Sequence, residues 1–197
     1  MIDEMKAGRR RERTVAGLCL LLGLLEWAGS ARPAEDPIAA IRALYARTNE
    51  SIRIAREKRG EGGGLYATEV SVNSLDGPWR AVGNYTRKAT FWFNDQPEFA
   101  RMEDREELSV LVKVEVQTTA AVRTTQEEFL FDGGTLVFYY RRAKAGQEAA
   151  EEDRLYFQGG RLIRRIPDPP AGEDPADAAA VQGSARALKN LFLATFE

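Results

Sequence analysis

The clearest pattern of hydrophobic and polar positions in the chain is an alternation that begins at Leu108. Valine occupies every second position from residue 110 to residue 116, and polar or charged residues, including Lys113 and Glu115, fall mostly between them. Leu111 is the one exception to this alternation. A period of two predicts a β-strand with one buried face, so we expect a half-buried strand here.

Two later segments share the pattern Phe-x-Gly-Gly-x-Leu followed by valine or isoleucine, at residues 131–137 and 157–163. Glycine adopts the positive φ that tight turns require, and the aromatic and β-branched flanks favour strands. Two consecutive hairpins of one type predict an antiparallel meander.

The first hairpin turns at Asp132-Gly133 or at Gly133-Gly134, and both choices give its side chains the same faces. One face then carries Phe129, Phe131, Leu136 and Phe138. The other face carries Leu130, Val137 and Tyr139, together with Glu128 and Arg141. Because both faces are apolar near the turn, the second face is either covered by a helix or lines a pocket.

An amphipathic helix is predicted on each side of the strand-rich region. Asp36-Pro37 provides an N-cap and a proline in the first turn, and Asp174-Pro175 repeats the device. The apolar stripe of the first helix consists of Ile38, Ile41, Tyr45, Thr48, Ile52 and Ala55. The stripe of the second helix consists of Val181, Ala185, Leu188, Phe192 and Thr195. Spacings of three and four are those of one helix face.

The remaining segments complete the predicted order of elements. Strands are expected at 65–73, 79–93 (divided at Gly83) and 122–131, with a loop or a short helical turn at 98–107, a loop at 143–153 and a proline-rich linker at 168–174. The fold class is therefore α+β. It is an antiparallel β-meander of about seven strands, packed by an N-terminal and a C-terminal amphipathic helix.

Residues 1–31 have the features of a signal peptide. Lys6 and the arginines up to Arg13 form a basic n-region, and Val15–Leu25 is an uninterrupted apolar run. A run of this length suits an h-region and is too short for a membrane-spanning helix, which needs about 20 residues.

We therefore expect export from a bacterial cell to the periplasm or beyond, with cleavage after Ser30 or Ala31. Residues 32–197 would then form a single α+β domain. Translation from Met5 instead of Met1, and retention of the segment as an uncleaved membrane anchor, are alternatives that the sequence leaves open.

Composition excludes several kinds of chemistry. The chain has no histidine, which excludes a Ser-His-Asp triad and histidine-ligated metal sites. Cys19 is the only cysteine, so no disulfide forms within the chain. The net charge of -2 does not indicate a nucleic-acid-binding protein, whose footprint would be a clustered basic surface.

The candidate ligand-binding residues are Trp92, Glu128, Tyr139 and Arg141. Aromatic rings stack on sugars or lipids, or pack in the core. Arg141 is expected across the hairpin from Glu128, directly or diagonally. If that face is a pocket, Arg141 meets an anionic ligand group; otherwise the two residues form a surface ion pair.

Paired carboxylates are the remaining candidate chemistry. Glycoside hydrolysis uses two carboxylates about 5–10 Å apart. The acids that would have to converge are Glu69, Asp95, Glu98 and Glu115. We assign no catalytic residue, and we expect no metal and no cofactor.

The expected function is that of an exported, non-enzymatic cell-envelope protein whose sheet provides a binding or scaffolding surface. A small apolar ligand or an envelope protein is the expected partner. One alternative is a carrier of a lipid-like ligand, in which the face with Leu130, Val137 and Tyr139 opens to a cavity. The other alternative is a carboxylate-dependent hydrolase.

Overall fold

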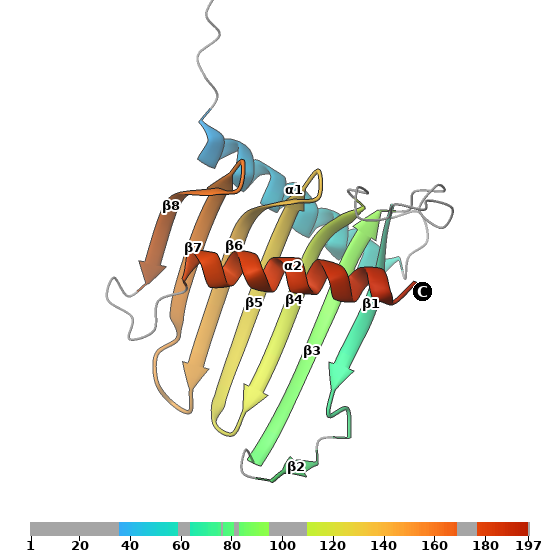
Figure 1. Cartoon of the computed structure of the whole chain (residues 1–197), viewed down its shortest axis with the longest axis vertical. Coiled ribbons are helices and arrows are strands. Elements are labelled where there is room, and N and C mark those ends of the chain that lie inside the picture. Colours follow the sequence, from blue (N-terminus) through green and yellow to red (C-terminus); the bar gives the residue numbers. More distant parts are fainter. Residues whose placement is uncertain are drawn as a thin grey trace, which may run out of the picture. The chain divides into compact units, whose positions relative to one another are not determined.

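A seven-stranded antiparallel sheet lies at the centre of the computed structural model (Figure 1). Its strands follow the order β1-β3-β4-β5-β6-β7-β8, and the two-residue strand β2 pairs with the start of β3. The structure describes residues 36–58, 64–75, 77–80, 83–94, 110–168 and 177–196. The predicted α+β meander is confirmed.

The bounds of the elements are as follows. The strands are β1 (Leu65–Val72), β2 (Pro78–Trp79), β3 (Gly83–Asn94), β4 (Leu111–Ala120), β5 (Arg123–Asp132), β6 (Thr135–Ala145), β7 (Glu151–Gln158) and β8 (Arg161–Asp168). The helices are α1 (Pro37–Glu57) and α2 (Ala178–Ala194). The predicted signal peptide 1–31, the loop 98–107 and residues 169–174 of the linker lie outside the described residues.

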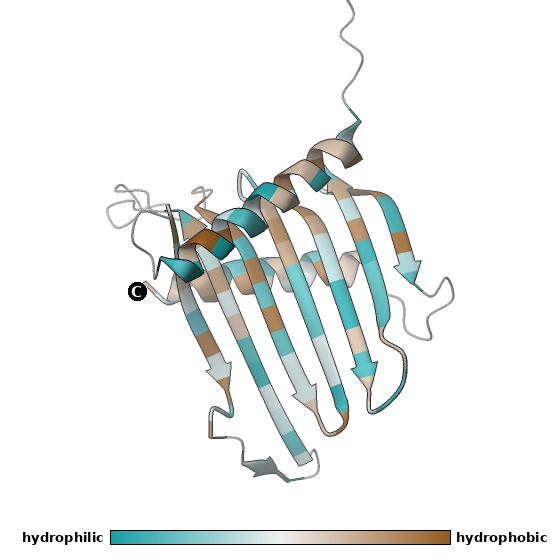
Figure 2. Ribbon diagram, turned by 180° about the vertical axis from the view of Figure 1, so that it is seen from behind, coloured by the Kyte–Doolittle hydropathy of each residue, from teal (hydrophilic) through white to brown (hydrophobic). Residues whose placement is uncertain are grey.

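The two helices cover opposite faces of the sheet. Figure 1 shows α2 crossing in front of the strands, and Figure 2, from behind, shows α1 crossing the other face near one end of the strands. Among the elements that the structure describes, no helix covers the part of this face beyond α1 (Figure 2). We refer to the two faces as the α1 face and the α2 face.

Each helix begins at an aspartate that caps it. The Asp36 carboxylate accepts a hydrogen bond from the backbone N–H of Ile38, and Pro37 follows, as predicted. The cap of α2 is Asp177, whose carboxylate accepts from the N–H groups of Ala179 and Ala180. The prediction of Asp174 as this cap was wrong, because Asp177 stands directly before the alanine-rich start of the helix.

A separate apolar core lies on each face. The core under α2 includes Phe91, Val114, Phe129, Tyr139, Leu155 and Phe157 from the sheet, packed against Val181, Ala185, Leu188 and Phe192. Under α1, Ile41 packs with Leu130, Phe138 and Tyr156, and Ile52 and Ala55 pack with Leu65 and Trp92. Both helices therefore place their predicted stripes against the sheet, with the exception of Thr195, which is exposed and caps the C-terminal end of α2.

Three strands contain a register shift close to their first residue. The extra residues are Val112 in β4, Val137 in β6 and Ile163 in β8. Because strands alternate in direction along the meander, these three begin at the same end of the sheet. A β-bulge inserts one residue and reverses the facing of every residue beyond it relative to a regular strand.

The bulge at Val137 overturns part of the predicted facing. The turn is Gly133-Gly134, with φ of 54° and 75°, and Asp132 pairs with Thr135. Beyond the bulge, Phe138 faces α1 and Tyr139 faces α2, the reverse of the prediction. The bulge at Val112 has the same effect in β4, and it accounts for Leu111, which lies on the α2 face with Val114 and Val116.

The predicted acidic loop at 143–153 was too long. Strand β6 continues to Ala145 and β7 begins at Glu151. Arg142 pairs with Glu152 across these strands, so opposite charges support the ladder where composition alone indicated a loop.

Candidate functional site

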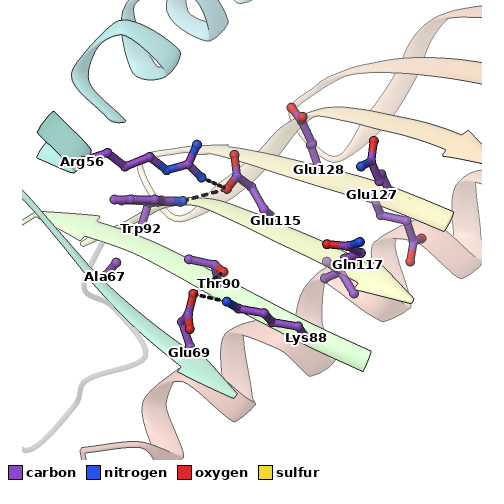
Figure 3. Close-up of a pocket in the computed structure, with 12 residues that line it drawn as sticks. Arg56, Ala67, Glu69, Lys88, Thr90, Trp92, Glu115, Gln117, Glu127 and Glu128 are labelled. Carbon is purple, nitrogen blue, oxygen red and sulfur yellow. Dashed lines mark hydrogen bonds and ion pairs between the residues drawn. The ribbon is translucent and has the colours of Figure 1, made fainter. Parts of the chain in front are cut away.

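A groove on the α1 face is the principal candidate site. It has a volume of about 810 Å³ and lies over β1, β3, β4 and β5, beside the C-terminal end of α1 (Figure 3). We call it the α1-side groove. Its lining includes Arg56, Glu69, Lys88, Thr90, Trp92, Glu115, Gln117, Gln126 and Glu128. The groove is mostly polar because it begins where the cover of α1 ends.

Strand register explains why these side chains gather. Thr90 on β3 is paired with Glu69 on β1 and with Glu115 on β4, and Glu115 is paired with Glu128 on β5. Residues directly opposite each other share a face. This single row across four strands therefore brings three carboxylates and a hydroxyl to the floor of one groove.

Lys113 is the buried cation beside this row. Lys113 is only 1% exposed. Lysine is rarely buried unless its ammonium group has partners. The ammonium lies 2.8 Å from Glu128 Oε2, 3.1 Å from Glu115 Oε1 and 2.8 Å from Asn49 Oδ1. It also lies 5.2 Å from the centre of the Tyr45 ring. The three acceptors match the three donors of the ammonium group, so its hydrogen-bonding capacity is saturated.

Glu115 links Lys113 to the open groove. Its Oε2 accepts hydrogen bonds from the indole of Trp92 at 3.1 Å and from Arg56 at 2.7 Å. Burial alone would raise the pKa of Glu115, but Lys113, Trp92 and Arg56 together lower it below its ordinary value. Glu115 is therefore a carboxylate at neutral pH.

Tyr45 ties the helix to Glu128. Its hydroxyl donates a hydrogen bond of 2.7 Å to Glu128 Oε2. Burial, followed by this hydrogen bond to a carboxylate, raises the pKa of Tyr45 well above its ordinary value. The phenol therefore remains a neutral donor, and Glu128 accepts from both Tyr45 and Lys113.

A second ion pair lies across Thr90 from the first. Lys88 Nζ is 2.8 Å from Glu69 Oε1, which also accepts from the Thr90 hydroxyl at 3.2 Å. The side chains of Lys88 and Glu69 are 51% and 50% exposed. Figure 3 shows this pair and the Arg56–Glu115 pair with Thr90 between them. The floor of the groove thus carries two ion pairs that a ligand can reach.

A smaller cavity of about 320 Å³ adjoins the groove between α1 and the sheet. It shares Arg56, Glu115 and Glu128 with the groove, and Asn49 and Lys113 also line it. The buried ammonium therefore lines a space that borders on the same carboxylates.

The structure brings together two of the four residues that the sequence singled out. Trp92 and Glu128 both belong to the network around Lys113. Tyr139 lies on the opposite face, where its hydroxyl donates to Glu127 at 2.8 Å. A role in ligand binding stays a prediction for all four residues singled out from the sequence.

Arg141 is also on the opposite face from Glu128. Its strand partners are Glu127 and Asp153, whereas Glu128 is paired with Tyr140. The predicted pairing of Arg141 with Glu128 was therefore wrong. The physical reason is the extra residue at Val137, which shifts every later residue of β6 by one position against β5.

The apolar cavity considered from the sequence is not found at its expected place within the described residues. Leu130 is 0% exposed under α1, and Tyr139 is 2% exposed under α2. The side chains that the cavity would have needed on one face are divided between two packed cores.

Sequence reasoning missed Lys113, Tyr45, Asn49 and Arg56 as site residues. The helix spacing held a usable indication, because residues 45, 49, 52 and 56 recur at intervals of three and four and share one face. The polar members of that face lie over the polar positions of β4. Only the packing of α1 on the sheet shows that the two sets meet.

The other carboxylate candidates divide into two groups. Glu69 and Glu115 lie in the same groove, on either side of Thr90. Asp95 and Glu98 lie outside the described residues. Within the described residues, no three His, Cys, Asp or Glu side chains gather closely enough to hold a metal ion, and no helix is long and apolar enough to cross a membrane.

No family model matches the chain, and no curated protein or solved structure is significantly similar to it.

Proposed function

We propose that this protein is a non-enzymatic binding protein, and that the α1-side groove takes up a small zwitterionic, peptide-like ligand. The observation that carries the proposal is that two ion pairs lie on the floor of one groove: Lys88–Glu69, with side chains 51% and 50% exposed, and Arg56–Glu115, with side chains 59% and 26% exposed. A ligand with one positive and one negative group complements both.

Exchange of partners in these ion pairs costs little free energy. The Arg56 side chain is 59% exposed, and solvent-exposed ion pairs contribute about 0–1 kcal/mol. A ligand ammonium group replaces Arg56 at Glu115 or Lys88 at Glu69, and a ligand carboxylate binds the released cation. Lys113 keeps Glu115 in place during the exchange, because its own contacts are buried.

The rest of the lining suits amide groups. Thr90, Gln117 and Gln126 supply hydroxyl and amide groups that donate and accept hydrogen bonds. The volume of about 810 Å³ falls within the range of small-molecule sites, roughly 300–1,000 Å³. A lining of charges and amides favours a short peptide over a lipid-like ligand.

The test is calorimetric titration of the whole chain with trialanine and with trialanine blocked at both ends. We expect saturable binding of the free tripeptide and at least about tenfold weaker binding of the blocked form, which lacks both charges. Lys88→Gln should weaken binding of the free peptide, and Lys144→Gln, at an exposed lysine outside the groove, should not. Equal affinity for the free and blocked peptides, or no saturable binding of either, would overturn the proposal.

Carboxylate-dependent hydrolysis is a second candidate, because Glu115 and Glu128 are directly opposite each other and both line the groove. Two features favour binding instead. A general acid needs a raised pKa, but the pKa of Glu115 is lowered. Glu128 already accepts hydrogen bonds from Lys113 and Tyr45, so its Oε2 atom is engaged in the network that attaches α1 to the sheet. Release of nitrophenol from aryl glycosides by the native chain, abolished in Glu128→Gln, would favour hydrolysis.

Export is a separate part of the proposal and rests on the basic and apolar pattern of residues 1–31. Expression in a bacterium followed by cell fractionation and intact mass measurement tests it. We expect the chain in the periplasm or the medium, with a mass that corresponds to cleavage after Ser30 or Ala31. A full-length chain in the cytoplasm would contradict it.

A further inference from the structure

The two Gly-Gly hairpins have the same local structure but differ in what they expose. Gly159 and Gly160 have φ of 55° and 74°, like their counterparts in the first hairpin, and the bulge follows at Ile163 as it does at Val137. Leu136 is 8% exposed, whereas the equivalent Leu162 is 42% exposed and Ile163 is 38% exposed. The second hairpin therefore presents two adjacent aliphatic side chains to solvent.

Position in the sheet explains the difference. Strand β6 lies between β5 and β7, whereas β8 ends the sheet within the described residues. Leu162 lies opposite Phe157 on the α2 face, and the extra residue Ile163 stands beside it. The sequence pattern that fills a core in the first hairpin is more exposed in the second, because β8 has a neighbouring strand on one side only within the described residues.

Arginines stand next to these two aliphatic residues along β8, and Arg164 shares the α1 face with its partner Tyr156, whereas Leu162 faces α2. Arg161 and Arg164 flank them in sequence, and both are exposed. Arg42 reaches the same corner from α1: its guanidinium lies 5.8 Å from the centre of the ring of Tyr156, the strand partner of Arg164. We call the set Arg42, Arg161, Leu162, Ile163 and Arg164 the basic tip.

Two of the three arginines in the basic tip have no carboxylate partner among the described residues, whereas the pKa of Arg42 is raised by its hydrogen bond to a tyrosine and, to a smaller extent, by the nearby Asp36 carboxylate. Within the described part of the chain, neither Arg161 nor Arg164 is paired with a carboxylate. The adjacent Arg165 differs, because it points to the α2 face and binds Asp153 through two hydrogen bonds. A chain with a net charge of -2 thus concentrates unpaired cations at one corner.

The edge of β8 is poorly suited to adding another strand. Charged side chains and proline protect sheet edges from pairing, and β8 carries three arginines and Pro167. Aliphatic side chains framed by arginines suit a different partner. Arginine binds lipid phosphates, and an aliphatic pair enters the boundary between headgroups and acyl chains.

The start of the folded unit lies at the same corner. Figures 1 and 2 both show the first turn of α1 beside the β7–β8 hairpin, and Ile38 packs on the same core cluster as Ile166.

We propose that the basic tip docks the protein on an anionic lipid surface, with Leu162 and Ile163 inserted at the level of the headgroups and the three arginines bound to lipid phosphates. This surface is separate from the α1-side groove and does not depend on the function proposed for that groove.

The test places a nitroxide at Ile163→Cys in the whole chain, with Cys19→Ser so that the label has a single site. Vesicles of phosphatidylglycerol and of phosphatidylcholine are added, and the accessibility of the nitroxide to oxygen and to a water-soluble nickel complex is measured. We expect shielding from nickel and access to oxygen with phosphatidylglycerol only. A label at Val122→Cys, 76% exposed at the opposite end of the sheet, should stay in water.

Charge reversal separates docking by the tip from attachment by residues 1–35. Arg161→Glu with Arg164→Glu should lower the shielded fraction at residue 163 by about tenfold or more, because each arginine near an anionic surface contributes about a fivefold factor. The matched control is Arg123→Glu with Lys144→Glu, at two exposed residues of the opposite end, which should change nothing. A nitroxide at residue 163 that stays in water, equal shielding by both lipids, or insensitivity to the reversal would each overturn the proposal.

Discussion

Glu115 on β4 and Glu128 on β5 are directly opposite each other in the sheet, although like charges in this position repel. The ammonium of Lys113 contacts both carboxylates and removes the conflict. All three side chains lie on the α1 face, where Asn49 and Tyr45 complete their hydrogen bonds. The attachment of α1 to the sheet therefore depends on a charged network as well as on its apolar stripe.

Lys113→Met should destabilise the fold strongly. The variant keeps most of the volume but leaves two carboxylates opposite each other, and removal of one partner from a buried ion pair costs about 3–5 kcal/mol. Because both glutamates keep some contact with solvent, we expect the lower end of this range in the free energy of unfolding, measured with urea. The matched variant Lys144→Met, at an exposed lysine, should change it by less than about 0.5 kcal/mol.

A second substitution distinguishes charge from packing. Adding Glu128→Gln to Lys113→Met removes the like-charge pair and should restore part of the lost stability. If the double variant is as unstable as the sum of the two single variants, the carboxylates do not interact through Lys113.

Glu115 should make stability depend on acid pH. Its pKa is lower in the folded chain than the ordinary 4.5, so the folded state holds the carboxylate in preference to the acid. The stability that this contributes is present above the ordinary value and is lost as the pH falls through the folded value. The difference in unfolding free energy between the native chain and Glu115→Gln should therefore shrink from about pH 6 to about pH 3. A difference that does not change with pH would contradict this.

The tyrosines should limit stability at alkaline pH. Burial, followed by the neighbouring Glu127, raises the pKa of Tyr139, and burial together with Glu152 raises that of Tyr140 to about 12. These phenols stay neutral when folded but ionise near pH 10 when unfolded, so stability is lost as the pH rises above about 10.

Tyr139→Phe tests the contribution of the buried phenol. It should cost about 1–2 kcal/mol at neutral pH, because Glu127 loses a donor, and it should reduce the loss of stability between about pH 9 and pH 11. Urea unfolding at several pH values measures both effects. A Tyr139→Phe chain that loses stability at alkaline pH as steeply as the native chain would contradict the assignment.

Deletion of Val137 should be tolerated better than deletion of a residue from a regular part of the sheet. Without Val137, Leu136 and Phe138 become adjacent and keep their partners Phe131 and Leu130, so the hairpin becomes regular and every face is preserved. We expect a cost of about 1–3 kcal/mol from lost packing and curvature.

The matched deletion is Thr125, which has regular partners in both β4 and β6. This deletion should move every side chain on one side of residue 125 in β5 to the opposite face of the sheet and so prevent folding. Loss of the β-sheet signal in circular dichroism and loss of cooperative unfolding would show it. Equal tolerance of the two deletions would mean that the bulge does not set the register.

Local patterns were sufficient for most of the fold. The stripe from Ile41 to Ala55 and the turn glycines at 133–134 depend on neighbours in sequence, and the structure has them as predicted. Gly83 does divide the predicted strand 79–93, but the short strand β2 before it folds back and pairs with the start of β3, so the division is not a bend within one strand. The predictions of the α2 cap and of the length of the β6–β7 loop were wrong. In each case several neighbouring residues were similarly suited to end or begin the element.

The candidate site was predicted less well. Trp92 and Glu128 do meet in one network, but Tyr139 and Arg141 lie on the other face. In the sequence, Lys113 was recognised only as one of the polar residues in an alternating strand, which indicated an exposed side chain. Its burial depends on Tyr45 and Asn49, which are more than sixty positions away in sequence.

The amino-acid sequence by itself determined that two amphipathic helices flank an antiparallel meander without disulfides or histidine chemistry, because helix period, strand period and turn residues act over a few positions. Only the tertiary structure decided which residues share a face and which charges meet. A bulge adds a single residue whose effect on facing extends along the whole strand, and α1 selects its partners on β4 and β5 only when it packs on them.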